Sequence, residues 1–122
     1  MVVHTALPDP LTAVDAVLAP TALDHAPHGD TDPVAAAEQA AGDPAAIALI
    51  GPFRSADVAE AVEATAPRRL PLLAPVATWA GVTRDDEPGC DDDARHRGTV
   101  LRLVARDTVV AARIAGDVRA AG

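Results

Sequence analysis

Lysine is absent from this chain of 122 residues, and all ten basic residues are arginines. The sequence therefore lacks the lysine that contacts a phosphate in P-loop proteins, the Schiff-base lysine of pyridoxal phosphate enzymes and the lysine of phospho-receiver domains. It also lacks a phosphate-binding glycine loop and a G-x-S-x-G nucleophile elbow, because three residues separate Gly51 from Ser55. We therefore expect a protein that is not an enzyme, with no catalytic residues and no cofactor.

Positive charge is scarce as well: the formal net charge is -8 and the sequence pI is about 4.7. This balance opposes binding to nucleic acid and docking on an anionic membrane surface. No apolar run approaches the roughly 20 residues of a membrane span, and the first residues lack the pattern of a secretory signal. We expect no nucleic acid partner, no membrane insertion and a cytoplasmic location for the sequence as given, or a periplasmic or extracellular one if a leader has been removed.

Aromatic residues make up only 2% of the chain, whereas hydrophobic residues make up 49%. The core must therefore consist of Ala, Val, Leu and Ile, and Phe53 and Trp79 stand out as isolated large side chains. The single cysteine, Cys90, cannot form an internal disulfide and leaves the redox compartment open. The length is that of one domain.

Short apolar runs alternate with segments of helical periodicity along the chain. The runs predict strands over 2–7, 21–26, 45–50, 70–74 and 99–104. The periodic segments predict helices over 11–18, over 33–41, from 55 to the proline at 67, and from 107 to the end. This alternation predicts one α/β lobe over residues 1–122, a three-layer doubly wound, flavodoxin- or Rossmann-like parallel sheet of about five strands in the order 2-1-3-4-5. The polar and acidic stretch at about 79–98 is expected to be a loop.

Polar residues stand where three of these helices begin. Asp32, Ser55 and Asp107 are each expected to cap the helix that follows. In the last helix, apolar residues recur at helical spacing and fall on one stripe. The stripe consists of Val110, Ile114, Val118 and Ala121.

Two hydroxyl residues, Ser55 and Thr78, follow the third and fourth predicted strands. Open α/β sheets bind ligands at the carboxyl ends of their strands. A helix N-terminus also presents free N–H groups and the positive end of a dipole to an anion. The pattern favours a small-molecule site at this edge.

Four segments in order resemble a known family: Asp-Pro at 32–33, Ile-Ala-Leu-Ile-Gly at 47–51 with Ser55 four residues later, Pro-Leu-Leu-Ala-Pro-Val-Ala-Thr at 71–78, and Leu-Arg-Leu-Val-Ala-Arg-Asp at 101–107. Together they resemble the N-terminal lobe of type I periplasmic binding proteins, specifically the branched-chain amino acid (Leu/Ile/Val) binding receptors of ABC transporters. The resemblance covers roughly residues 21–122 and implies a role in amino acid binding and transport.

The resemblance also implies a binding site. Ser55, Ala77 and Thr78 would hold the α-carboxylate and α-ammonium groups of an amino acid, and Phe53 or Trp79 would line the side-chain pocket. The family's receptors close two lobes on the ligand, whereas this sequence matches only the first. We therefore expect affinity to come from one lobe or from a second copy of the chain in a homodimer.

Other interpretations remain open beside this one. Ser55 is equally well explained as a plain helix cap, and Arg102 as a structural residue with a carboxylate partner or an edge position. His25 and His28, with Asp24, fall near a turn and need no special role. A metal site is not expected at Cys90, Asp91, Asp92, Asp93 and His96, because their spacing matches no zinc or calcium loop. The alternative function is a degenerate lobe that binds no ligand and acts as a homodimerising interaction or regulatory module.

Overall fold

The computed structural model describes residues 1–6, 21–29, 32–82 and 99–121. Its centre is a parallel sheet of five strands in the order β2-β1-β3-β4-β5. The strands are β1 (Val2–Thr5), β2 (Asp24–Pro27), β3 (Ala46–Ile50), β4 (Leu72–Ala74) and β5 (Val100–Arg102). This topology confirms the predicted α/β class and the predicted strand order.

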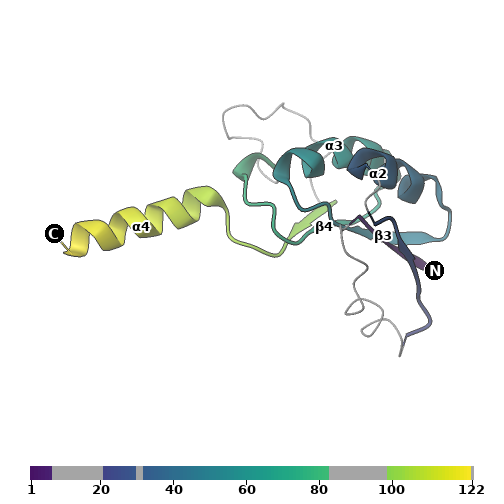
Figure 1. Ribbon diagram of the computed structural model, residues 1–122, viewed down its shortest axis with the longest axis horizontal. Coiled ribbons are helices and arrows are strands. Elements are labelled where there is room, and N and C mark those ends of the chain that lie inside the picture. Colours follow the sequence, from purple (N-terminus) through teal and green to yellow (C-terminus); the bar gives the residue numbers. More distant parts are fainter. Residues whose placement is uncertain (7–20, 30–31, 83–98, 122) are drawn as a thin grey trace.

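Helices connect the strands and follow the last one. They are α2 (Pro33–Gly42), α3 (Ser55–Thr65) and α4 (Asp107–Ala121), with short 3-10 helices η1 (Ala66–Arg68) and η2 (Ala80–Val82). Helices α2 and α3 pack side by side on one face of the sheet, whereas α4 extends away from it (Figure 1). The helix predicted over 11–18 lies outside the described residues, and so do residues 83–98 of the loop predicted at about 79–98, whose first residues form η2 instead.

The start of α2 follows directly from its sequence. The Asp32 carboxylate accepts the backbone N–H groups of Val34 at 3.0 Å and Ala35 at 3.1 Å, so it is the predicted N-cap. Pro33 occupies the first helical position, where its missing N–H is not needed. The cap fixes the residue at which α2 begins, and this start determines which of its side chains face the sheet.

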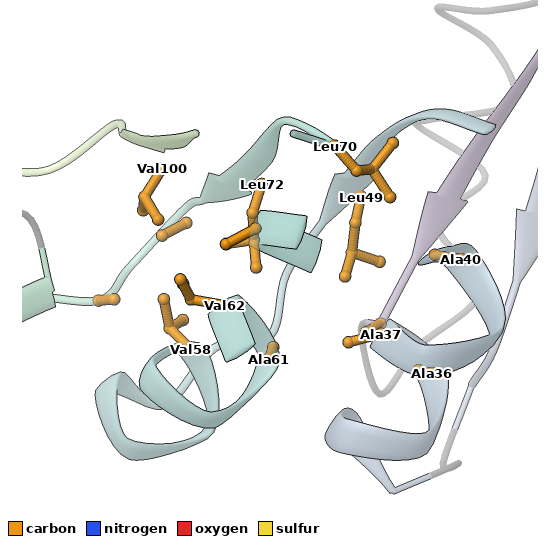
Figure 2. Packing of buried hydrophobic residues seen from close by; sticks show 14 of the residues in the cluster. Ala36, Ala37, Ala40, Leu49, Val58, Ala61, Val62, Leu70, Leu72 and Val100 are labelled. Atoms are coloured by element: carbon orange, nitrogen blue, oxygen red, sulfur yellow. The ribbon is translucent and has the colours of Figure 1, made fainter. Parts of the chain in front are cut away.

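The core lies between the sheet and the α2–α3 layer (Figure 2). Leu49, Leu72 and Val100 sit opposite one another on β3, β4 and β5, and all three are buried. The helices pack against these three strand residues with small side chains, which let the helix backbones approach the sheet closely. These are Ala36, Ala37 and Ala40 of α2 and Val58, Ala61 and Val62 of α3. A nearly aromatic-free core is therefore filled by close approach rather than by large rings.

Helix α4 forms where the sequence predicts a helix, but it does not begin as predicted. Asp107 is its first residue rather than its cap, and the Arg106 carbonyl accepts the first N–H groups, from Val109 and Val110. The predicted apolar stripe is also uncovered, because no residue of α4 is buried. Amphipathic periodicity specifies the helix but does not place a partner against its apolar side.

Candidate functional site

The segments that follow β3 and β4 meet at the carboxyl edge of the sheet. Because β3 and β4 are parallel neighbours, the segments that follow them leave the sheet at the same edge. The backbone N–H of Trp79 donates a hydrogen bond to the Ser55 hydroxyl oxygen across 3.2 Å. The structure thus brings together segment 51–55 and segment 75–79, which hold the residues that the sequence singled out: Phe53, Ser55, Ala77, Thr78 and Trp79.

Ser55 does not cap α3, and that expectation was wrong. The residue before the helix is Arg54, which makes no side-chain cap hydrogen bond, and Ser55 is the first helical residue. Its hydroxyl oxygen instead accepts the hydrogen bond from the Trp79 N–H. An oxygen that accepts in this way keeps its own O–H as a donor for a further group.

The turn into α3 depends on glycine. Gly51 has a φ of 98°, a conformation that L side chains rarely adopt, and its N–H donates to the Leu73 carbonyl at 2.9 Å. The chain therefore turns sharply at the end of β3 and directs the first turn of α3 at this edge. The N–H groups of that turn have no partner within the helix and attract anions. Asp57 lies in the same turn and partly offsets this attraction.

The remaining predicted residues differ in what they can offer a ligand. The Ala77 side chain is fully buried in the core cluster, so only its backbone could face a ligand. Thr78 is partly exposed, and its carbonyl oxygen accepts from the Asp107 N–H at 3.0 Å. Phe53 and Trp79 are 39% and 37% exposed, so both rings are accessible beside the site. Backbone groups and the hydroxyls of Ser55 and Thr78 are therefore among the polar groups that a ligand could contact here.

Arg102, on β5, holds the 78–79 backbone in place. Its guanidinium donates to the Thr78 carbonyl at 2.9 Å and to the Trp79 carbonyl at 2.7 Å. The expected structural role is therefore right: β5 is an edge strand of the sheet, and the guanidinium binds two backbone carbonyls. Burial is the main cause that lowers the pKa of Arg102, and nearby Arg106 adds to it. The side chain remains a cation because an arginine pKa starts far above neutrality.

A second polar cluster was missed by the sequence reasoning. His4 Nε2 lies 3.0 Å from an Asp43 carboxylate oxygen, and His4 Nδ1 lies 2.8 Å from His28 Nε2. The two rings stack with centroids 5.1 Å apart. Separately, His25 Nε2 lies 2.8 Å from the hydroxyl of Thr5, the next residue of β1, whose side chain points to the opposite face of the sheet. The segment that appeared to need no special role therefore supplies His28 to the cluster with His4 and Asp43.

The ionisation of this cluster is set by its surroundings. Burial is the main cause that lowers the pKa of His28, and the neighbouring His4 contributes. The pKa of Asp43 is lowered first by a hydrogen bond from the Ala45 N–H and then by the one from His4. These partners favour an anionic Asp43 beside His4 and a neutral His28. No local sequence pattern indicates this cluster. His4 is 24 positions from His28 and 39 positions from Asp43, and the fold brings the three residues together.

Within the described residues, no group of three or more His, Cys, Asp or Glu side chains is placed to hold a metal ion. The candidates at 90–93 and 96 lie outside those residues. Over the same part of the chain, none of the helices has the length and apolar character needed to cross a membrane.

The parallel sheet, the α2–α3 layer and the loops at its carboxyl edge form an α/β lobe whose fold resembles part of known substrate-binding proteins. Two solved structures from Desulfitobacterium hafniense match this fold over the full length of the present chain. One is an ABC transporter substrate-binding protein in complex with Leu, with a TM-score of 0.77 and 19% identity, and the other is an ABC transporter substrate-binding protein with a TM-score of 0.75 and 20% identity. The predicted resemblance is confirmed at the level of the fold.

The match covers 100% of this chain but only 39% of each of those proteins. The chain thus corresponds to about two fifths of a substrate-binding protein. No protein-family model and no curated protein sequence matches it.

Proposed function

We propose that this chain is a non-enzymatic, single-lobe binding protein for a small amphipathic molecule, specifically an amino acid. The observation that carries the proposal is the hydrogen bond from the Trp79 N–H to the Ser55 hydroxyl. It joins the first turn of α3 to the 75–79 segment at the edge of the sheet where such folds bind ligands. One structural neighbour was solved with Leu, which makes leucine the first ligand to test.

The chemistry of each part suits one end of an amino acid. The first turn of α3 and the Ser55 O–H suit the α-carboxylate, because free N–H groups and a hydroxyl donor converge there. The Thr78 hydroxyl can accept from the α-ammonium group. The accessible rings of Phe53 and Trp79 suit an aliphatic side chain. Ala77 contributes its backbone, since its side chain is buried.

The proposal is tested by calorimetric titration of the chain with leucine, isoleucine, valine and a panel of other amino acids. Thr78→Val is the sharpest variant, because it removes the hydroxyl and keeps the branched shape and the carbonyl that Arg102 and Asp107 use. We expect saturable binding that falls at least tenfold in Thr78→Val and in Ser55→Ala. Thr108→Val, at an exposed hydroxyl of α4, is the matched control. Absence of binding at millimolar ligand would overturn the proposal.

The interaction-module alternative is favoured by a different observation. Helix α4 presents Val110, Ile114 and Val118 at 44%, 58% and 66% exposure. Such a stripe indicates contact with another surface. In this second candidate function the chain acts through association, whether or not it retains a ligand.

A further inference from the structure

One side chain of the sheet reaches both ends of the α2 crossover. His4 of β1 pairs with Leu49 of β3, so both side chains lie on the sheet face that α2 and α3 cover, and His4 is only 5% exposed. His4 Nε2 lies 3.0 Å from a carboxylate oxygen of Asp43, the C-cap residue of α2. His4 Nδ1 lies 2.8 Å from Nε2 of His28, which follows β2 and precedes α2. His4 therefore ties the chain that enters α2 and the chain that leaves it to strand β1.

These hydrogen bonds fix the nitrogen on which each ring carries its proton. An Asp43 carboxylate can only accept, and the Ala45 N–H, which donates to its other oxygen at 2.8 Å, favours the anionic form. His4 therefore carries its proton on Nε2, and its Nδ1 presents a lone pair. His28 Nε2 must then be the donor in the 2.8 Å contact with His4. His28 Nδ1 is the nitrogen left to take up a further proton.

The cluster can hold one further proton in this arrangement, but not two. With one, His28 becomes a cation and still donates from Nε2 to His4. With a second, His4 Nδ1 is protonated as well, and two N–H groups of two cationic rings face each other across 2.8 Å. That contact is repulsive, whereas the contact between protonated His4 and Asp43 becomes an ion pair. The second proton therefore breaks the cluster between His4 and His28.

Of the two rings, His28 is the one that can move away. His4 is held in β1 between β2 and β3, whereas His28 is half-buried and lies just after β2. The next residue, Gly29, has a φ of 56° and open space around it. We propose that Asp43, His4 and His28 form a pH-sensitive latch, which holds the start of the β2–α2 connection against β1 and releases His28 when the second proton binds.

The charged groups on the neighbouring elements are compatible with this latch. Arg68 of η1 donates to the Asp43 backbone carbonyl at 2.8 Å and favours the Asp43 anion. On β2, His25 contacts the Thr5 hydroxyl on the opposite face of the sheet. On α2, the Asp32 carboxylate caps the helix, and Glu38 is exposed on its surface. The proton balance of the latch is therefore set by its own three side chains, with Arg68 supporting the anion.

The direction of the pH effect follows from the same contacts. Burial and the neighbouring His4 lower the pKa of His28 from its ordinary 6.5, so the held state resists protonation. The pKa of Asp43 is lowered from 3.8, so Asp43 is still an anion and still pairs with His4 when His28 is protonated. The released state binds one more proton than the held state. Acid therefore favours release, by up to about tenfold in the ratio of released to held chains for each pH unit.

Nitrogen NMR of the chain with isotope-labelled histidine tests the proton order directly, because the two ring nitrogens show which of them is protonated. At about pH 8 we expect Nε2–H tautomers for both His4 and His28. On acidification the two rings should titrate as a pair in two steps, and the amide signals of His28 and Gly29 should move with the second step. The buried amides of Leu49 and Leu72 should stay unchanged. An Nδ1–H tautomer of His28, two independent titrations, or movement of the buried amides together with His28 would each overturn the proposal.

A matched pair of variants separates the latch from a general effect of acid. His28→Gln places an amide N–H where the ring has Nε2 and takes up no proton, so it should keep the connection held. The Gly29 amide signal should report release in the native chain and little change in His28→Gln over the same pH range. Glu38→Gln removes one exposed carboxylate of α2 and should follow the native curve. Equal release in His28→Gln and the native chain would overturn the proposal, and neither result depends on ligand binding.

Discussion

The N–H of Trp79 donates a hydrogen bond of 3.2 Å to the hydroxyl oxygen of Ser55, the first residue of α3, although the two residues are 24 positions apart in the sequence. Trp79 is the only tryptophan of the chain. The residue is 37% exposed beside the candidate site, so its fluorescence reports on the same loop that the hydrogen bond holds. The hydrogen bond between Trp79 and Ser55 thus holds the site together, and the fluorescence of Trp79 can be used to follow it.

Removing the acceptor should loosen this contact without unfolding the sheet. For Ser55→Ala we expect the free energy of unfolding to fall by about 0.5–1.5 kcal/mol, the usual contribution of one hydrogen bond. The Trp79 emission should shift to the red as the loop moves into water. Chemical denaturation and fluorescence spectra measure the two effects, and Thr108→Ala serves as the control at an exposed hydroxyl. An unchanged spectrum and stability would contradict the role of this hydrogen bond.

Arg102 should affect the same loop from the opposite side. Arg102→Met keeps much of the aliphatic stem and removes the donors to the Thr78 and Trp79 carbonyls. Because hydrogen bonds to a charged group are stronger, we expect a loss of about 1.5–3 kcal/mol of unfolding free energy. Arg102→Lys should recover little, since an ammonium lacks the planar fork that reaches both carbonyls. Arg113→Met is the control, because its ion pair lies on the exposed surface of α4. Equal losses at both arginines would argue against a positioning role for Arg102.

Much of the fold could be predicted because local patterns and topology agree. The run at 45–50 reads as a buried strand, and the structure has β3 there. Asp32 and Pro33 mark the start of α2 in the sequence and in the structure. Right-handed connections between parallel strands leave few possible orders, and the observed one is among them.

The errors arise where long-range contacts decide between locally equivalent states. A serine at the start of a helix can cap it or turn its hydroxyl elsewhere, and only the position of Trp79 shows which occurs. The link between His4 and Asp43 spans 39 positions and has no local sequence signal. Apolar spacing predicts helix α4 correctly but is silent on whether its own sheet or another chain covers it.

Substitution of a buried leucine should cost more unfolding free energy than substitution of an exposed one. Leu49 is fully buried beneath α2 and α3, whereas Leu103 is 66% exposed. Leu49→Ala should lower the free energy of unfolding by about 2–5 kcal/mol, because it removes apolar contacts and leaves a cavity. Leu103→Ala should change it by less than about 0.5 kcal/mol, as for most surface substitutions. Urea denaturation of both variants measures the difference. Similar losses would mean that Leu103 is covered in solution.

The histidine cluster predicts how stability depends on pH. His28 has an ordinary pKa of 6.5, which burial and the neighbouring His4 lower in the folded chain. Between the unfolded and folded values the unfolded chain binds more protons, so the free energy of unfolding falls as the pH drops below about 6.5. Asp43, with a pKa lowered from 3.8, should cause a further loss at still lower pH.

The groups around this cluster identify which side chain causes the first loss. His4 stacks on His28, His25 lies on β2, and Asp43 faces His4, while Arg68 donates to the Asp43 backbone carbonyl. We expect His28→Asn to flatten the stability profile just below pH 6.5 and to leave the loss at lower pH in place. Glu38→Gln, at an exposed carboxylate of α2, changes the net charge without touching the cluster and should keep both losses. Urea denaturation at closely spaced pH values measures all three chains. If His28→Asn keeps the native profile, His28 is not the group that makes folding sensitive to pH in this range.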